Sequence, residues 1–281
     1  MVTVGPVPDR LASMATVRVR LFARQRQIAG SREVNVELAD GATVADAWAA
    51  VVALFPALGT DTPYVRYGRN GTYAAADEAV AEGDEVSCIP PVAGGSARAE
   101  GKPTAGGHAA DESGARARGV LLEFTDSPID AALIAHLLEA TQSPGDGAQA
   151  VFIGRTRETS GTPAPGQEAD AARHSGQRVL RLDYEAYESM ALAVFEAIAA
   201  EVGERFGVER MAILHRTGPV VVGEVSVAIV VATPHRDAAF DACRYAIDEL
   251  KARAPIWKAE QFENGSVWLG APAREGPVVG S

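Results

Sequence analysis

The chain has 281 residues, a length typical of about two domains, and its 47% hydrophobic content can supply a core for each. Its formal net charge of −11 argues against non-specific nucleic-acid binding, which needs a basic surface. A chain of this charge can still hold a local basic pocket for an anionic small molecule. No stretch approaches the ~18 consecutive apolar residues of a membrane span, so we expect no membrane association.

The chain contains two cysteines, Cys88 and Cys243. They have neither the spacing of metal ligands nor that of a disulfide framework, and we expect no metal site. Each lies among apolar residues, which favours a buried small side chain over a reactive thiol. Sparse cysteine use suits a reducing compartment, and residues 1–15 lack a signal-peptide core. We therefore predict a cytoplasmic protein that begins with a disordered extension over 1–15.

Residues 16–95 are predicted to form a small α+β domain. Apolar and polar residues alternate in 16–23 and again in 32–40, a pattern typical of half-buried strands. The short connection between the two runs contains Gly30, so the pair is interpreted as a hairpin.

A helix is predicted next, over 44–55, because apolar residues recur there at helical spacing. Thr43 is a suitable N-cap, and Pro56 is expected to end the helix. An Asn-Gly turn within 64–73 then indicates a short strand pair, and 82–92 closes the domain with a strand.

Residues 96–118 contain no aliphatic side chain larger than alanine. Such a segment cannot bury enough apolar surface to offset its chain entropy, so it is predicted to be a flexible linker. A coil of this length spans about 25–30 Å, enough for the first domain to dock on its own second domain or on a neighbour's. Gly94 and Gly95 precede it. They form a narrow peptide that can thread a tight channel, or they simply begin the linker.

The second domain is predicted over 119–281. A strand after Gly119 leads into a helix with Ser127 as N-cap and Pro128 at its first position. A further strand emerges over 148–158, and the Gly/Pro/Ala-rich segment 160–177 is predicted to be a mobile loop.

The rest of this domain mixes strands and helices with hairpin-like neighbours, which favours an α+β fold. Thr233 and Pro234 are expected to begin a long helix over 235–254, which Pro255 ends. Phe240, Cys243, Ile247 and Leu250 are expected on its buried face. The remaining elements are predicted as strands at 178–187, 210–218 and 224–234, a helix at 190–206, and two short strands within 255–270.

His235 and Arg236 lie in the first turn of the long predicted helix. Free backbone N–H groups, the positive end of the helix dipole and two basic side chains together favour an anion site there. Asp237 partly offsets this positive charge. A solvated surface turn with no ligand is an equally good interpretation of these residues.

Four further basic residues lie at the ends of predicted elements. Lys251 is near the end of the long helix, and Lys258 follows the break at Pro255. Arg155 and Arg157 lie where a strand runs into a loop, a common place for ligand contacts. Each of these four residues, considered alone, could be an ordinary surface residue. Together, in an acidic protein, they favour one localised anionic ligand.

The sequence resembles molybdopterin synthase over most of 16–94 and 119–270. The first domain is similar to the small subunit, a ubiquitin-like β-grasp sulfur carrier, in "TVRVRLFA" and in "EGDEVSCIPPVAGG" with its terminal Gly94-Gly95. The second resembles the large subunit, which implies an α/β-hammerhead-type α+β fold. The matching stretches are "VFIGRTR", "LDYEAYESMA", "ILHRTG", "TPHRDAAFDACRYAIDELKARAPIWKAE" and "SVWLG".

The resemblance implies a sulfurtransferase. An adenylyltransferase and sulfurtransferase partner converts the tail glycine to a thiocarboxylate. That tail enters a pocket of the large-subunit-like domain, where cyclic pyranopterin monophosphate receives two sulfurs and becomes the dithiolene of molybdopterin. No metal or other cofactor is implied for the transfer, and large subunits pair, so a homodimer through the C-terminal domain is expected.

Roles for individual residues follow from the same resemblance. Lys251 matches the catalytic lysine of the family. The expected role of its side chain is acid/base catalysis or charge stabilisation near the acyl carbon of the tail. Lys258 matches a second essential lysine close to the tail. Residues that match pocket positions for phosphate and pterin are Arg157, His235 and Arg236, with Arg155 a weaker candidate.

The chain departs from the family in its fusion, because Ser96 follows the second glycine through a peptide bond. An amide cannot be adenylated as a free carboxylate can, so cleavage after Gly95 is expected, in a linker of protease-accessible composition. Two other functions stay open. One is a non-enzymatic sulfur carrier fused to a pterin-binding module, and the other is a ubiquitin-like interaction module beside an unrelated anion-binding domain.

Overall fold

The computed structural model describes residues 14–92 and 119–270. Gly94, Gly95, the predicted linker 96–118 and residues 1–13 of the predicted extension lie outside the described residues. The chain divides into two compact units, 1–90 and 91–281, which are described separately. Among the described residues, no helix is long and apolar enough to cross a membrane.

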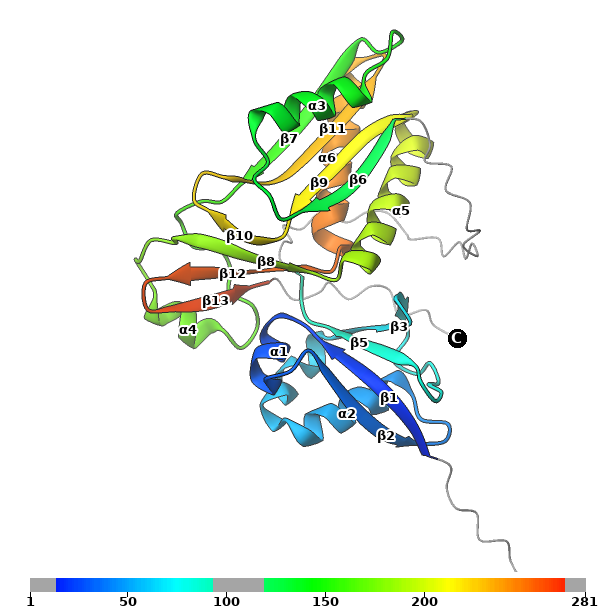
Figure 1. Ribbon diagram of the computed structural model, residues 1–281, viewed down its shortest axis with the longest axis vertical. Helices are drawn as coiled ribbons and strands as arrows, with labels where there is room; N and C mark the ends of the chain where they lie inside the picture. The colour runs from blue at the N-terminus through cyan, green and yellow to red at the C-terminus, as the bar shows by residue number, and fades with distance from the viewer. Residues whose placement is uncertain (1–13, 93–118, 271–281) are drawn as a thin grey trace, which may run out of the picture. The chain divides into compact units, whose positions relative to one another are not determined.

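The first unit is a five-stranded sheet with the strand order β2-β1-β5-β3-β4 (Figure 1). β1 runs antiparallel to β2 and parallel to β5. The side chains of α2 pack on the sheet in one apolar cluster that contains Trp48 and Val51, as in a β-grasp domain. The elements are β1 (Met14–Leu21), α1 (Ala23–Ala29), β2 (Glu33–Ala39), α2 (Val44–Leu54), η1 (Pro56–Tyr64), β3 (Arg66–Arg69), β4 (Thr72–Ala74) and β5 (Glu85–Ile89).

Two local predictions for this unit need correction. β1 and β2 pair as expected, but α1 lies between them where a short hairpin connection was predicted. Gly30 ends that helix with φ at 66°, a left-handed conformation that suits glycine. Pro56 ends α2 but also begins a 3-10 helix. The Thr43 cap is confirmed, since its side chain accepts from the Asp46 amide and the Asp46 carboxylate accepts from the Thr43 amide.

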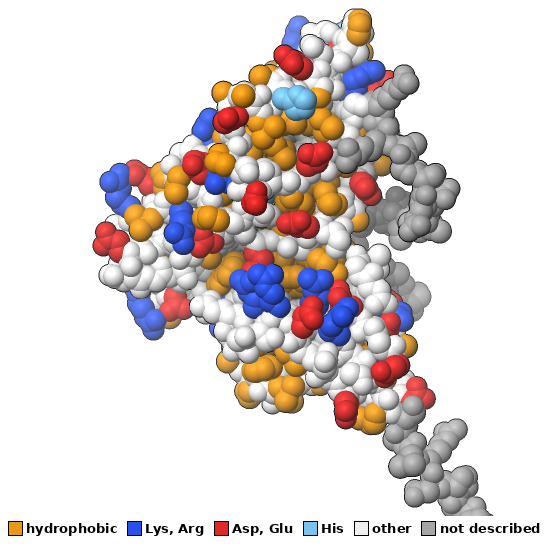
Figure 2. Space-filling model, viewed as in Figure 1, with side chains coloured by type: hydrophobic (Ala, Val, Ile, Leu, Met, Phe, Trp, Pro, Cys, Tyr) orange, Lys and Arg blue, Asp and Glu red, His pale blue; other side chains and the backbone are white. Residues whose placement is uncertain are grey.

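Ion pairs of the first unit range from partly exposed pairs on β1 and β5 to the nearly buried pair of Arg24 and Asp61. Arg18 and Arg20 on β1 contact Glu85 on β5 at 3.0 and 3.4 Å. On the face shown in Figure 2, basic side chains of this unit gather beside acidic ones. Such exposed pairs add little stability, and this face offers no continuous basic stripe of the kind that binds nucleic acid.

The second unit contains two four-stranded sheets, with orders β6-β9-β11-β7 and β10-β8-β12-β13 (Figure 1). This mixture of strands and helices confirms the α+β prediction. The elements are β6 (Val120–Thr125), α3 (Ala131–Thr141), β7 (Ala148–Arg155), α4 (Glu168–Arg173), β8 (Arg181–Ala186), α5 (Glu188–Phe206), β9 (Arg210–Arg216), β10 (Gly218–Val221), β11 (Val225–Thr233), α6 (Arg236–Arg253), β12 (Ile256–Phe262) and β13 (Gly265–Leu269).

β11 is buried along its whole length because both faces of its sheet are covered. Ile229 and Val231 pack in one apolar cluster with α5 and α6. Ala228 and Val230, on the alternate face, pack in another cluster with α3. The nearly continuous apolar run of this strand is typical of a strand with no solvent-facing side.

Both N-cap residues predicted for this unit are wrong, by three residues for α3 and by two for α6. The N-cap of α3 is Asp130, whose carboxylate accepts from the Leu133 amide at 2.9 Å, and not Ser127. The N-cap of α6 is His235, without a capping side-chain bond. The Thr233 hydroxyl donates instead to the His235 carbonyl at 2.8 Å.

Two further predictions fail in part. Residues 160–177 are not all loop, because α4 forms within them and the Ala164 amide donates to the Trp268 carbonyl at 2.8 Å. Phe240 is 65% exposed, although Cys243 and the other residues predicted for its face are buried. The buried stripe of α6 includes the alanines at 239, 242 and 246, and Phe240 lies outside it.

Both cysteines are buried and unpaired, as predicted. Burial raises the pKa of the Cys88 thiol, and it raises the pKa of the Cys243 thiol to about 11. A thiol held in its neutral form is a poor nucleophile, so neither side chain is suited to carry sulfur.

Candidate active site

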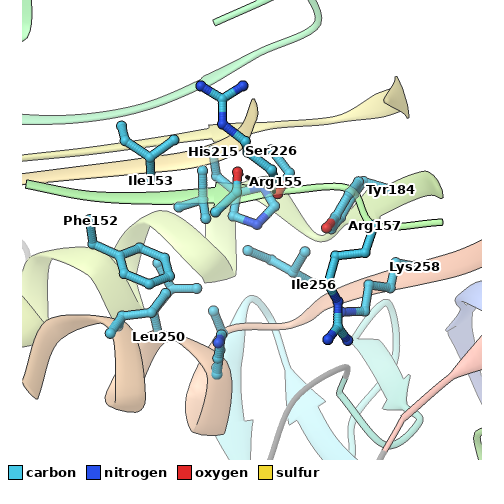
Figure 3. Close-up of a pocket in the computed structure, with 15 residues that line it drawn as sticks. Phe152, Ile153, Arg155, Arg157, Tyr184, His215, Ser226, Leu250, Ile256 and Lys258 are labelled. Atoms are coloured by element: carbon cyan, nitrogen blue, oxygen red, sulfur yellow. Dashed lines mark hydrogen bonds between the residues drawn. The ribbon is translucent and has the colours of Figure 1, made fainter. Parts of the chain in front are cut away.

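A cavity of about 430 Å³ lies within the second unit, where the two sheets meet the last turns of α6 (Figure 3). Its apolar walls come mainly from β7, α6 and the start of β12. Its lining is Phe152, Ile153, Gly154, Arg155, Arg157, Tyr184, His215, Ser226, Val227, Ile247, Leu250, Lys251, Ala254, Ile256 and Lys258.

Four of the predicted site residues line this one cavity: Arg155, Arg157, Lys251 and Lys258. The short connection between α6 and β12 brings the two lysines to the same cavity. α6 ends at Arg253, and β12 begins at Ile256 and pairs with β8. The chain has three lysines in all, the third being Lys102. Two of the three therefore line the same cavity. This placement argues against the interpretation that they are ordinary surface lysines.

The electrostatics of the cavity centre on Lys258. Burial lowers its pKa most, and the positive charges of Lys251 and Arg157 lower it further, while Glu260 acts in the opposite direction. Figure 3 shows the Arg157 and Lys258 side chains extending in the same direction. Closely spaced cations that are partly withdrawn from water bind an anion well, because the anion relieves their mutual repulsion.

Glu260 fixes the wall beside these cations. Its side chain is 3% exposed and accepts from the Gly161 amide at 2.7 Å. Burial raises the pKa of this carboxyl, and its contact with Gly161 and the charge of Lys258 oppose that shift. The bond ties the segment that follows Arg157 to β12.

Arg155 is held differently from the other three basic residues. Its guanidinium donates to the Gly223 carbonyl at 2.7 Å. In Figure 3 it extends in the opposite direction to Arg157 and Lys258. It therefore lines the cavity with the aliphatic part of its side chain.

His235 and Arg236 do not line this cavity. Both are exposed at the first residues of α6, whereas Lys251 lies in the last turn of the same helix. A helix rises 1.5 Å per residue, so 15 residues place them about 22 Å apart along the axis. One copy of the chain therefore does not bring all the predicted site residues together.

His215 is a lining residue that the sequence analysis missed as a functional side chain. It lies on β9 and is 5% exposed. Burial, and to a smaller extent the charge of Lys258, lower its pKa to about 4 against the opposing bond to the Arg216 carbonyl, so the ring is neutral at neutral pH. The available signal was a histidine and an arginine at the end of an otherwise apolar strand pattern, "MAILHR".

A β-grasp unit and an α+β unit with a cationic cavity are thus joined in one chain. The family model for MoaE protein matches residues 124–253, and that for the ThiS family matches 19–95. A molybdopterin synthase catalytic subunit of Bacillus subtilis is 38% identical over 148 residues, 53% of this chain and 83% of its own length.

Other relatives are similar over the same region. The catalytic subunit of Halalkalibacterium halodurans is 38% identical over 49% of this chain and 80% of its own. A crystal structure of molybdopterin synthase from Staphylococcus aureus is 32% identical over 56% of this chain and 98% of its own, with a TM-score of 0.44. The chain belongs to the MoaE family of molybdopterin synthase catalytic subunits, which act in molybdenum cofactor biosynthesis, and it carries a ThiS-family domain in the same polypeptide.

The coupling between the two cavity lysines gives a direct prediction. Replacing Lys251 by methionine removes a positive neighbour, so the pKa of Lys258 should rise. It should stay below that of an ordinary lysine, because burial remains. The titration of ¹³C-methylated lysines by NMR measures this, since the chain has only three. An unchanged Lys258 titration in Lys251→Met would show that the two ammonium groups do not interact.

Proposed function

We propose that this chain transfers sulfur from a thiocarboxylate on Gly95 to cyclic pyranopterin monophosphate and so forms the dithiolene of molybdopterin. The observation that carries the proposal is the pairing of a ThiS-family match that ends at residue 95 with a MoaE-family cavity lined by two of the three lysines. The transfer uses the tail's own sulfur, and no metal is invoked for it.

Each part of the cavity has a role in this proposal. Arg157 and Lys258 supply positive charge for the cyclic phosphate and for the thiocarboxylate. Lys251 lies at the mouth of the cavity, where its ammonium group is 5.7 Å from the centre of the Phe152 ring. We assign it to the charge that develops on the acyl oxygen, since a cation preset in a partly dry site stabilises such an oxyanion strongly.

The tail must have a free carboxyl end before it can be charged. Adenylation needs a carboxylate, and in the intact chain Gly95 is joined to Ser96 by an amide. We infer that the chain is cut after Gly95 and that a separate adenylating and sulfur-donating enzyme then charges the glycine. The tail then serves the cavity of its own second unit or that of another copy.

A homodimer through the C-terminal unit accounts for His235 and Arg236. These residues lie about 22 Å along α6 from Lys251, so a second copy is the simplest source of a phosphate contact from them. A closed twofold interface would place each copy's helix start near its partner's cavity on both sides.

Mixing two damaged variants tests this arrangement. Lys251→Ala and Arg236→Ala should each be inactive alone. After subunit exchange, half of the dimers are mixed and each holds one intact site, so about one quarter of the wild-type activity should return. Native mass spectrometry confirms the exchange. Mixed dimers that stay inactive would place Arg236 outside the partner's site.

The function itself is tested by incubating the protein, cut after Gly95 and charged there, with cyclic pyranopterin monophosphate and measuring the dithiolene product. Wild-type protein should form it without any other catalytic protein. A protein that accepts sulfur on its tail but never forms the dithiolene would instead be a sulfur carrier that serves another pathway, which is the alternative that the ThiS-family domain alone supports.

A further inference from the structure

His215 is placed in the cavity wall with little freedom to move. It lies on β9, and its ring contacts Tyr184 edge-on, with 5.2 Å between ring centres. Phe124 lies on another side at 6.0 Å. Figure 3 shows its imidazole in the wall of the cavity, in the group of side chains that includes Ser226 and Tyr184.

The hydrogen bonding of this ring defines its tautomer. Nδ1 lies 2.9 Å from the Arg216 carbonyl oxygen, which can only accept, so Nδ1 carries the proton. Nε2 of the neutral ring is then an acceptor. Among the described residues no hydrogen-bond donor to Nε2 is found, and the one bond of the ring is that of Nδ1.

His215 also differs chemically from the rest of the described lining. The other titratable lining groups are two guanidinium groups, two ammonium groups and the phenol of Tyr184. No carboxylate lines the cavity in the described part of the chain, and Glu260 is bonded to Gly161 beside it. Burial holds the pKa of His215 at about 4, and Tyr184 keeps a raised pKa for the same reason. Nε2 is therefore a neutral nitrogen base in a cavity whose other charged lining groups are cations, and the charge of Lys258 acts on it.

The chemistry of the proposed function requires such a base at one step. A thiocarboxylate sulfur that attacks a substrate carbon displaces the oxygen substituent of that carbon, as the C–O bond breaks, and leaves a thioester between the tail and the substrate. To release it, water must add to the acyl carbon and the acyl carbon–sulfur bond must break. The products are the Gly95 carboxylate and the substrate thiol, and one proton of the water must be accepted as it attacks.

We propose that His215 accepts that proton through Nε2 and so acts as the general base for release of the tail. The inference rests on the proposed function. It divides the work of the cavity between Lys251 and Lys258, whose cations stabilise the developing oxyanion, and the neutral imidazole, which activates the water. Nδ1 stays bonded to the Arg216 carbonyl, which also stabilises the imidazolium formed when Nε2 takes the proton.

The test is a single-turnover reaction of the chain cut after Gly95, with the thiocarboxylate on Gly95 and the second fragment present, with cyclic pyranopterin monophosphate, followed by mass measurement of both fragments. His215→Ala and His215→Gln should form the tail–substrate thioester at the wild-type rate but hydrolyse it at least about 10²-fold more slowly. Added imidazole should restore hydrolysis in His215→Ala, a rescue that a purely structural role would not produce. His136→Ala, at an exposed position on α3, is the matched control.

The outcomes separate this inference from the function on which it rests. Wild-type hydrolysis rates in folded His215→Gln would overturn the role of His215 and leave the function intact. Loss of the first sulfur transfer in both variants would also overturn it, because the residue would then act earlier. Wild-type protein that forms neither thioester nor dithiolene would overturn the proposed function itself.

Discussion

Lys251→Ala should lower the rate of dithiolene formation by about 10²–10³-fold, the usual cost of removing one preset donor to an oxyanion. Lys251 is exposed at the end of α6, and its ammonium group makes no ion pair within 4 Å in the described part of the chain. The stability of the fold should therefore change little. Thiolation of the tail should be unaffected, since the proposed function assigns it to a separate enzyme.

The measurement is product formation together with the mass of the charged fragment that ends at Gly95. Lys102→Ala is the matched control, because Lys102 is the third lysine of the chain and belongs to the predicted linker. Lys251→Arg tests charge alone and should retain more activity than Lys251→Ala. Full product formation by Lys251→Ala would remove the lysine from the mechanism and favour the carrier function.

Gly95→Trp should abolish product formation, a loss of at least about 10² in rate. A side chain at the reacting residue widens a peptide that must thread a narrow path to the lysines, and it displaces the acyl carbon from the cations. The effect should exceed that of any single cavity variant other than the lysines, because Gly95 is the residue that carries the sulfur in this account.

Ser96→Ala is the control, since it changes the neighbouring residue after the expected cut and leaves the tail intact. Mass spectrometry of protein purified from its own host should show a fragment ending at Gly95. An intact chain that forms the dithiolene, or an active Gly95→Trp, would contradict the requirement for a free and slender tail.

Much of the fold follows from sequence pattern, because period and composition are local properties. The alternation in β1 and β2 and the apolar run of β11 identify the strands. Helix starts were less well predicted. Ser127 and Asp130 are both good caps, and only the direction of the following chain decides which one faces the free amides. α1 was missed because its seven residues are too short for periodicity to be visible.

Some residues of the site were predicted and others were missed, because only some of them have a local sequence signal. Lys251 and Lys258 are identified by their sequence motif, and the structure brings them to one cavity. Phe240 was expected in the core, but helical spacing alone did not show that α6 approaches its sheet through alanines. His215 was missed because its function depends on the bond to the Arg216 carbonyl and on the cations around it, which are tertiary features.

The fate of the tail's sulfur tests the central claim most directly. The chain is charged with ³⁴S on Gly95, mixed with cyclic pyranopterin monophosphate, and both products are weighed by mass spectrometry. We expect two ³⁴S atoms in each dithiolene and a Gly95 carboxylate on every spent tail. The account is contradicted if the pterin gains no ³⁴S, or if transfer continues at the wild-type rate when Lys251 and Lys258 are both replaced by alanine.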